Sequence, residues 1–204
     1  MYEKYIKRAL DLLLSFMAFY VLLPFMIVIA ILIKLESPGP VLFKQKRIGR
    51  KGSHFMLYKF RTMRIDAPKD TPTHLLENPE SYITKTGKFL RRASMDELPN
   101  LINILHGEMS LIGPRPALWN QYDLAAERDK YRANDIYPGL TGLAQISGRD
   151  ELPIIQKAEL DGKYAQNLSL CMDLRCLLGT IDVVLRQRGI REGVNSNETY
   201  SNQR

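Results

Sequence analysis

The chain has 204 residues, which is enough for one domain with its own hydrophobic core and little more. Its 29 Lys and Arg residues against 22 Asp and Glu give a net charge of +7, which favours an acidic partner: nucleic acid, a phosphorylated substrate or an anionic membrane. The two cysteines, Cys171 and Cys176, match neither a CxxC pair nor a zinc pattern, so they indicate a reducing compartment and are expected to be small core residues.

An uncharged apolar run extends from Leu12 to Ile33, and a helix of that length reaches across the hydrocarbon core of a bilayer. The run is too long for a signal peptide, and no cleavage site follows it. Pro24 lies near its middle and predicts a kink, because proline removes an intrahelical hydrogen bond. Basic residues flank both ends, and such flanks belong in the cytoplasm. From the run alone, a full span and a re-entrant helix that returns to the same side are both open.

Residues 40–47 and 54–63 have the composition of two strands around a turn, which predicts a hairpin. Alternation along the second strand places Lys59 and Arg61 on one face. Two cations at this spacing usually mark a solvated face. The polar segment 66–82 is predicted to be a loop.

Residues 86–105 carry helical spacing and contain the sequence SMDELPN. Ser94 and Glu97 have the spacing of a capping box, which predicts a helix that starts beside Asp96. Acidic residues are common at helix starts for this reason, so the pair Asp96-Glu97 does not by itself distinguish a helix start from a catalytic site.

The second half of the chain combines short segments with longer helical ones. A short apolar segment ends in the rigid turn GPRP, residues 123–133 favour a helix, and the Gly-rich stretch 137–150 lacks a dinucleotide or P-loop pattern. Residues 161–189 read as an amphipathic helix, and 193–204 as a flexible polar tail. The apolar residues of this helix that are available for packing are Leu170, Leu174, Leu177, Leu178, Ile181 and Leu185.

The order of these segments resembles the bacterial sugar transferases, in particular the monotopic polyprenyl-phosphate phosphoglycosyl transferases. The resemblance extends from Lys7 to about Asp173, and the motifs that carry it are KRALD, the Pro-interrupted apolar run, KFRTM, SMDELPN, GPRP and PGLTGLAQ-x-SGR. Each motif is weak alone, but their order and spacing together are specific. Because little chain precedes KRALD, the resemblance is to the small, minimal form of the family.

The resemblance implies that a sugar 1-phosphate passes from a UDP-sugar to polyprenyl phosphate, by analogy undecaprenyl phosphate, with release of UMP. Asp96 would attack the sugar-linked phosphate and form a phosphoryl-aspartate, and Glu97 would assist the incoming lipid phosphate, with proton removal as one route. Mg²⁺ would accompany the reaction, with Asp96 as its protein contact. Galactose, glucose and modified hexosamines are all open as the sugar. The reaction would be the first membrane step of O-antigen, capsule, exopolysaccharide or glycoprotein glycan assembly.

A carboxylate that attacks a diphosphate needs cations to offset the repulsion between anions. Arginine suits this task because its planar fork donates two parallel hydrogen bonds. The glycines of PGLTGLAQ could equally serve only to turn the chain, and the arginine of SGR could be an exposed loop residue. The expected phosphate and substrate contacts are Lys59, Arg61, Arg91, Arg115, Gly139, Thr141, Gly142 and Arg149. Asp161 and Tyr164 also match the family pattern, without an assigned role.

The expected fold is α/β in the α+β sense, mostly helical, with a small β-hairpin and surface amphipathic helices. The resemblance favours a Pro24-kinked re-entrant membrane helix over residues 1–36, a cytoplasmic catalytic domain over 37–192 and the tail over 193–204. Leu23 precedes Pro24 where several members carry Ser, which leaves the sharpness of the break open. The expected location is the cytoplasmic face of the bacterial inner membrane, in contact with lipid. The oligomeric state is not indicated.

Two other functions compete with this interpretation. A basic, membrane-anchored adaptor without enzymatic activity, which binds anionic lipid or an acidic partner, would explain the charge of +7. It would not explain why Asp96-Glu97 lies between cationic motifs. Nucleic-acid binding is disfavoured because no recognised module is present and the apolar run would have no purpose.

Overall fold

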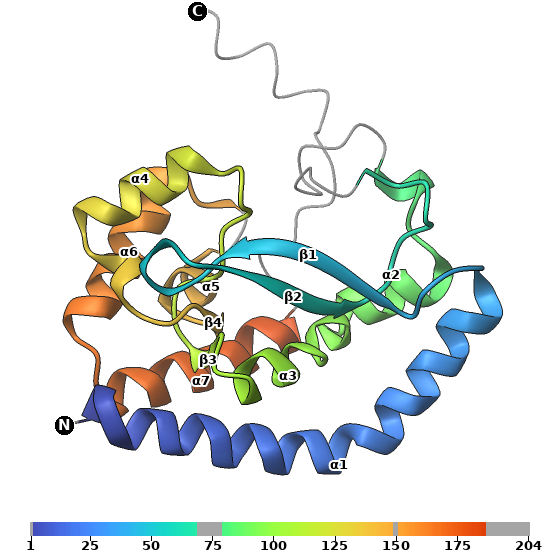
Figure 1. Cartoon of the computed structure of the whole chain (residues 1–204), viewed down its shortest axis with the longest axis horizontal. Helices are drawn as coiled ribbons and strands as arrows, with labels where there is room; N and C mark the ends of the chain where they lie inside the picture. The colour runs from blue at the N-terminus through green and yellow to red at the C-terminus, as the bar shows by residue number, and fades with distance from the viewer. Residues whose placement is uncertain (1, 69–78, 149–150, 187–204) are drawn as a thin grey trace, which may run out of the picture.

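The computed structural model describes residues 2–68, 79–148 and 151–186. A long helix, α1 (Lys7–Glu36), follows a single π-helical turn, η1 (Tyr2–Ile6), and runs along one side of the other elements (Figure 1). Within the described part of the chain, α1 alone is long and apolar enough to cross a membrane. It contains the whole apolar run, so the predicted helix is confirmed.

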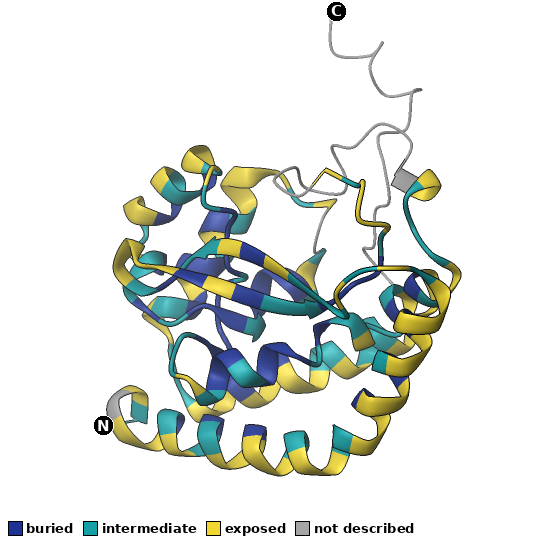
Figure 2. Cartoon of the chain, turned by 45° about the vertical axis from the view of Figure 1, so that its right-hand side comes forward, coloured by how far each residue is buried: buried dark blue, intermediate teal, exposed yellow. Residues whose placement is uncertain are grey.

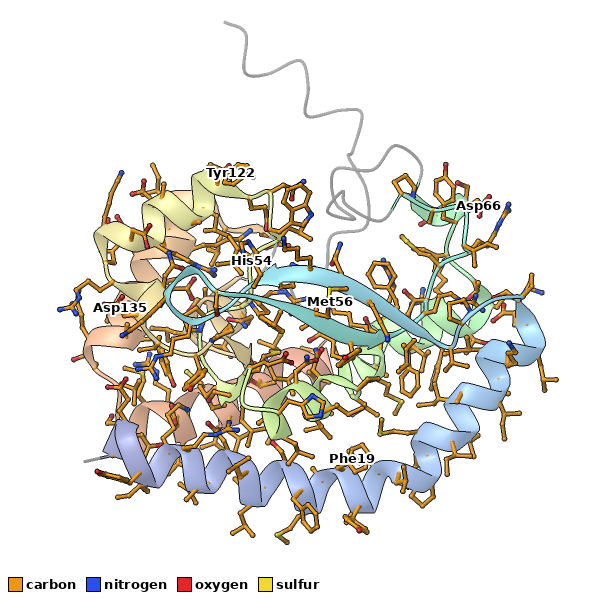
Figure 3. The ribbon with its side chains drawn as sticks, viewed as in Figure 1. Phe19, His54, Met56, Asp66, Tyr122 and Asp135 are labelled. Carbon is orange, nitrogen blue, oxygen red and sulfur yellow. The ribbon has the colours of Figure 1, made fainter. Side chains whose placement is uncertain are left out.

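Helix α1 continues through Pro24 and bends beyond Phe19 (Figure 3). A bend is expected there, because proline lacks an N–H and its ring clashes with the preceding turn. Around Pro24 the inner face of α1 packs on the domain through Met26, Ile29 and Ile33. The outer face is largely exposed (Figure 2), although most of its side chains are apolar.

Both ends of α1 are attached to the same domain. In its first turn, Lys7 Nζ lies 2.7 Å from Asp173 Oδ2 in α7 (Leu170–Arg186), and both side chains are buried. At its last residue, Glu36 accepts hydrogen bonds from the backbone N–H groups of Lys85 and Thr86. The two flanks of the apolar segment therefore contact one body.

The predicted hairpin is present as β1 (Leu42–Ile48) and β2 (His54–Phe60), which pair antiparallel and are joined by η2 (Arg50–Gly52). The inward face of β2 carries Phe55 and Leu57, which are buried. Lys59 is two residues beyond Leu57, so strand alternation places its side chain on the same inward face. The fold therefore does not place Lys59 on a solvated face, although such a face is usual for cations at this spacing.

The helix predicted over residues 86–105 is divided into α2 (Lys85–Arg92), η5 (Met95–Glu97) and α3 (Asn100–Leu105). Ser94 adopts a left-handed conformation with φ of 54°, and its side chain makes no capping hydrogen bond. The predicted capping box with Glu97 was therefore wrong, as was a helix that starts at Asp96. The chain turns at Ser94, and Asp96 lies in a single 3₁₀ turn before α3.

Apart from η4 (Pro79–Ser81), which directly precedes α2, the remaining elements form a second layer beside the hairpin (Figure 1). Two short strands in it pair parallel, with Ser110 opposite Gly139 and Ile112 opposite Thr141. The elements not yet named are β3 (Ser110–Ile112), α4 (Tyr122–Lys130), η6 (Ala133–Asp135), β4 (Gly139–Thr141), α5 (Leu143–Ser147) and α6 (Ile154–Gln166). The fold is thus mostly helical with two small sheets, as expected.

The amphipathic helix predicted over 161–189 is also divided, into α6 and α7, and its last residues lie outside the described part of the chain. Ser169 Oγ accepts a hydrogen bond from the Met172 N–H, which starts α7 after the turn at Asn167. Helix α7 packs inward through Asp173 and Cys176. Its six leucine and isoleucine residues that were expected to pack are instead all exposed.

Candidate active site

Two cations from distant segments meet at Glu97. Lys59 Nζ lies 2.7 Å from Glu97 Oε1, and Arg115 donates to Oε1 at 2.7 Å and to Oε2 at 3.3 Å. Lys59 comes from the end of β2, and Arg115 comes from the turn after β3. The Glu97 side chain is buried, with 11% of its surface exposed. Three of the predicted site residues therefore form one ion-pair cluster.

The two adjacent carboxylates have different electrostatic surroundings. Burial alone would raise the pKa of Glu97, but Arg115 and Lys59 outweigh burial and hold the pKa well below its ordinary value. Burial raises the pKa of Asp96, and the negative charge of Glu97 adds to this against partial opposition from Lys59 and Arg91. Of the two, Asp96 is therefore the carboxylate that gains more from an additional cation.

Asp96 lines a pocket of about 380 Å³ between the hairpin, the segment that follows it, and α2. It is the one acidic residue among the described residues of this lining. A pocket with one carboxylate and many cations attracts a polyanion such as a diphosphate. The basic residues of the lining are Lys44, Arg47, Lys59, Arg61, Arg64 and Arg91.

The structure gives Arg91 and Arg61 different surroundings. Arg91 lies at the end of α2, donates from Nε to Thr62 Oγ1 at 2.9 Å, and acts electrostatically on Asp96. The guanidinium of Arg61 donates to the backbone oxygens of Ser37 and Pro38 at 2.8 and 2.6 Å. Arg61 thus ties the segment after α1 to the hairpin, and these bonds draw its guanidinium toward that segment.

The glycines of PGLTGLAQ pack against the turn that carries Arg115. A Cβ at Gly139 would lie 2.0 Å from the backbone N of Gly113, and one at Gly142 would lie 2.1 Å from its backbone O. The Gly139 N–H donates to the backbone O of Pro114 at 2.8 Å. This N–H is engaged within the protein, so the geometry favours close backbone packing over a phosphate-binding turn.

Two further predicted contacts lie elsewhere. Thr141 Oγ1 is 2.7 Å from Thr180 Oγ1, so its hydroxyl joins β4 to α7. Arg149 lies outside the described residues.

Arg47 is a site residue that sequence reasoning missed. Its guanidinium donates to the backbone O of Pro116 at 3.0 Å, and its backbone forms a bridge with Leu118. Burial lowers the pKa of Arg47 to about 9, and repulsion from Arg115 adds to this shift. In the sequence, Arg47 is one of several basic residues of β1, and nothing in the pattern distinguishes it from the solvated ones.

The two family-pattern residues without an assigned role belong to buried structural contacts. Asp161 Oδ2 accepts two hydrogen bonds from Arg128, at 2.6 and 2.8 Å. The Tyr164 hydroxyl donates to Asp173 Oδ1 at 2.6 Å. Asp173 therefore joins Tyr164 to Lys7, and its importance was not apparent from the sequence.

The site offers little protein ligation for a metal ion. Among residues 2–68, 79–148 and 151–186, no group of three or more His, Cys, Asp or Glu side chains could hold one. Glu97 is occupied by Lys59 and Arg115, which leaves Asp96. One carboxylate together with substrate phosphates and water is a usual way to bind Mg²⁺, so the residues present fit that ion.

Comparison with known proteins shows the family of this chain. The bacterial sugar transferase family model matches residues 2–187. The uncharacterized sugar transferase EpsL of Bacillus subtilis (strain 168) is 43% identical over 160 residues, which cover 78% of this chain and 77% of that protein.

Two longer relatives are named for specific reactions. The UDP-glucose:undecaprenyl-phosphate glucose-1-phosphate transferase of Xanthomonas campestris pv. campestris is 37% identical over 189 residues, covering 89% of this chain and 39% of that protein. The UDP-N-acetylgalactosamine-undecaprenyl-phosphate N-acetylgalactosaminephosphotransferase of Aeromonas hydrophila is 37% identical over 195 residues, covering 92% and 45%. This chain thus spans less than half the length of either named transferase.

Proposed function

Since this chain belongs to the bacterial sugar transferase family, we propose that it transfers a sugar 1-phosphate from a UDP-sugar to undecaprenyl phosphate and releases UMP. The product, a polyprenyl-diphosphate-linked sugar, would be the first lipid-bound intermediate of a polysaccharide or another glycan. The names of two relatives make UDP-glucose and UDP-N-acetylgalactosamine the first donors to test.

The observation that carries this proposal is the position of Asp96. It is the single acidic group among the described residues that line a pocket rich in Lys and Arg, and it adjoins the cluster of Glu97, Lys59 and Arg115. A nucleophilic carboxylate needs access to the substrate and cations around the phosphate, and this position offers both.

In the first step, a carboxylate oxygen of Asp96 attacks the phosphorus that bears the sugar. The bond from that phosphorus to the bridging oxygen breaks, and UMP leaves with the electron pair. In the second step, an oxygen of the lipid phosphate attacks the same phosphorus, the bond to Asp96 breaks, and the carboxylate is regenerated. Lys59, Arg91 and Arg115 stabilise the charge that develops on the phosphate oxygens in both steps.

Mg²⁺, when bound, supplies additional charge neutralisation at the donor diphosphate, and Asp96 is the residue that would hold it. Because burial raises the pKa of Asp96, cations in the pocket have a second effect. They favour the ionised carboxylate, which is the nucleophilic form.

The attachment of α1 supports a re-entrant helix. Its first turn is joined to Asp173 and its last residue to Lys85 and Thr86, whereas a full span would separate its two ends across a bilayer. The outer face of α1 and the exposed apolar side chains of α7 would then contact lipid. We place the catalytic domain at the cytoplasmic face of the inner membrane, where a soluble nucleotide sugar and a lipid phosphate can meet.

The direct test is UMP release from a panel of UDP-sugars with undecaprenyl phosphate in detergent or nanodiscs. We expect catalytic UMP release with at least one donor. Tight binding to anionic vesicles together with no UMP release from any donor would favour the basic adaptor instead.

A further inference from the structure

We infer that Glu97 is a positioning residue, which fixes Lys59 and Arg115 beside Asp96 and does not accept a proton from the lipid phosphate. This inference rests on the proposed function, since it assigns a role within the same two-step reaction. The two adjacent carboxylates then have different roles: Asp96 is the nucleophile, and Glu97 holds the two cations in place.

The first argument is the occupancy of the Glu97 carboxylate. Oε1 accepts hydrogen bonds from both Lys59 and Arg115 at 2.7 Å, and Oε2 accepts one from Arg115 at 3.3 Å. A general base must offer a lone pair within hydrogen-bond reach of the proton that it removes. The two hydrogen bonds to Oε1 engage both of its lone pairs, and Oε2 also accepts from Arg115, so the carboxylate of Glu97 is mainly engaged by the cations that surround Asp96.

The second argument is the direction in which Glu97 faces. The described lining of the 380 Å³ pocket includes Asp96 and Lys59 but excludes Glu97. Glu97 lines an adjoining cavity of about 10 Å³, which shares Arg47 and Lys59 with the larger pocket and also includes Arg115. A cavity of that size holds at most one water molecule, so a lipid phosphate does not fit there.

The third argument is the repulsion that Glu97 offsets. Lys59, Arg115 and Arg47 come from separate segments, and each acts as a like charge on another in a largely buried cluster. Removing one partner of a buried ion pair leaves the other charge uncompensated, and the side chain then moves or loses its charge. Without the Glu97 carboxylate, Lys59 and Arg115 would lose their common anchor.

The two half-reactions distinguish an anchor from a base. With donor alone, the wild type should release one equivalent of UMP in a burst, and this step needs no acceptor. For Glu97→Gln, we expect a burst slower by at least about tenfold, because the cations that stabilise the first transition state are displaced. A normal burst with lost turnover and an accumulated phosphosugar adduct would overturn the inference, because a missing base affects only the second step.

A matched control is Glu127→Gln, which alters a glutamate in α4 that pairs with the exposed Lys130. It should leave the burst unchanged. Should Glu97→Gln fail to fold, Glu97→Asp retains the charge but shortens the side chain, and the anchor role predicts a slower burst for it as well. A normal burst in the folded Glu97→Asp protein would overturn the inference.

A readout independent of activity keeps the inference separate from the proposed function. Thermal unfolding of Glu97→Gln, Arg115→Gln and the double variant forms a double-mutant cycle, and we expect clear non-additivity between the two positions. Additive effects would overturn the anchor role. Absence of UMP release by the wild type would overturn the proposed function, while the cycle would still measure the coupling of Glu97 to Arg115.

Discussion

Lys7 Nζ lies 2.7 Å from Asp173 Oδ2, which joins the first turn of the apolar helix α1 to α7, 166 residues further along the chain. Asp173 also accepts hydrogen bonds from the hydroxyls of Tyr2 and Tyr164 at 2.6 Å. This buried group connects the apolar helix α1 to the elements that pack around Asp173, and the first prediction concerns its charge.

Asp173→Asn should destabilise the protein strongly, because it removes the nearer counter-charge of the buried Lys7 ammonium and leaves Lys7 with Asp11 Oδ1 at 4.0 Å. Breaking a buried ion pair by neutralising one partner costs about 3–5 kcal/mol. The matched control is Asp182→Asn on the same helix, whose pair with Arg186 is about half exposed and should contribute at most about 1 kcal/mol. Thermal unfolding in detergent measures both, and equal effects of the two variants would contradict the prediction.

Asp96→Asn should abolish UMP release and leave the unfolding temperature nearly unchanged, because an amide cannot serve as the nucleophile. The same variant should lose the phosphosugar adduct that intact mass spectrometry detects on the wild type when donor is supplied without acceptor. Asp123→Asn, at the start of α4, is the control and should keep both signals. Turnover retained in Asp96→Asn would point to a different nucleophile.

Gly139→Ala should reduce both stability and activity, because the new Cβ would lie 2.0 Å from the backbone N of Gly113 in the turn before Arg115. Overpacking against backbone costs about 1–3 kcal/mol or more. Gly179→Ala is the control, since the three atoms nearest to its Cβ belong to the side chain of Ile146, at 2.9 to 3.3 Å, and not to the backbone. Unfolding temperature and UMP release measure the effects, and a milder effect at position 139 than at 179 would count against this packing role.

The two cysteines should differ in alkylation. Burial, followed by the negative charge of Asp173, raises the pKa of Cys176 from 9.0 to about 11, so less thiolate is present at any given pH. Cys171 is exposed. At pH 8 the folded protein should take up one equivalent of maleimide, at Cys171, and the thiolate of Cys176 should appear about two pH units above its ordinary range. Equal labelling of both residues in the folded protein would be inconsistent with this difference.

The topology of α1 can be tested with Glu3→Cys in a Cys171→Ser background, since Glu3 is exposed and precedes the apolar segment. A re-entrant helix predicts labelling by a membrane-impermeant reagent in inside-out vesicles only. Labelling of intact spheroplasts from the periplasmic side would establish a full span.

Local patterns determined most of the elements but not where two of the long helices break. The predicted 86–105 helix breaks at Ser94, which adopts a left-handed backbone conformation. In the sequence, the same serine is equally consistent with a helix-capping residue. The helix predicted over 161–189 is divided by the turn between Asn167 and Ser169, and the spacing of the leucines does not indicate this turn. In both places the helical periodicity continues through a turn that packing favours.

The sequence by itself determined the apolar helix, the hairpin, the order of the motifs and the identity of the acidic pair, because these depend on periodicity and spacing along the chain. The tertiary structure alone decided that Lys59 faces inward to meet Glu97, that Arg61 binds the backbone after α1, and that Arg47 supports the turn of Arg115. These contacts join residues 23 to 69 positions apart. Which partner a buried charge acquires depends on how separate elements pack, and no pattern within one element contains that information.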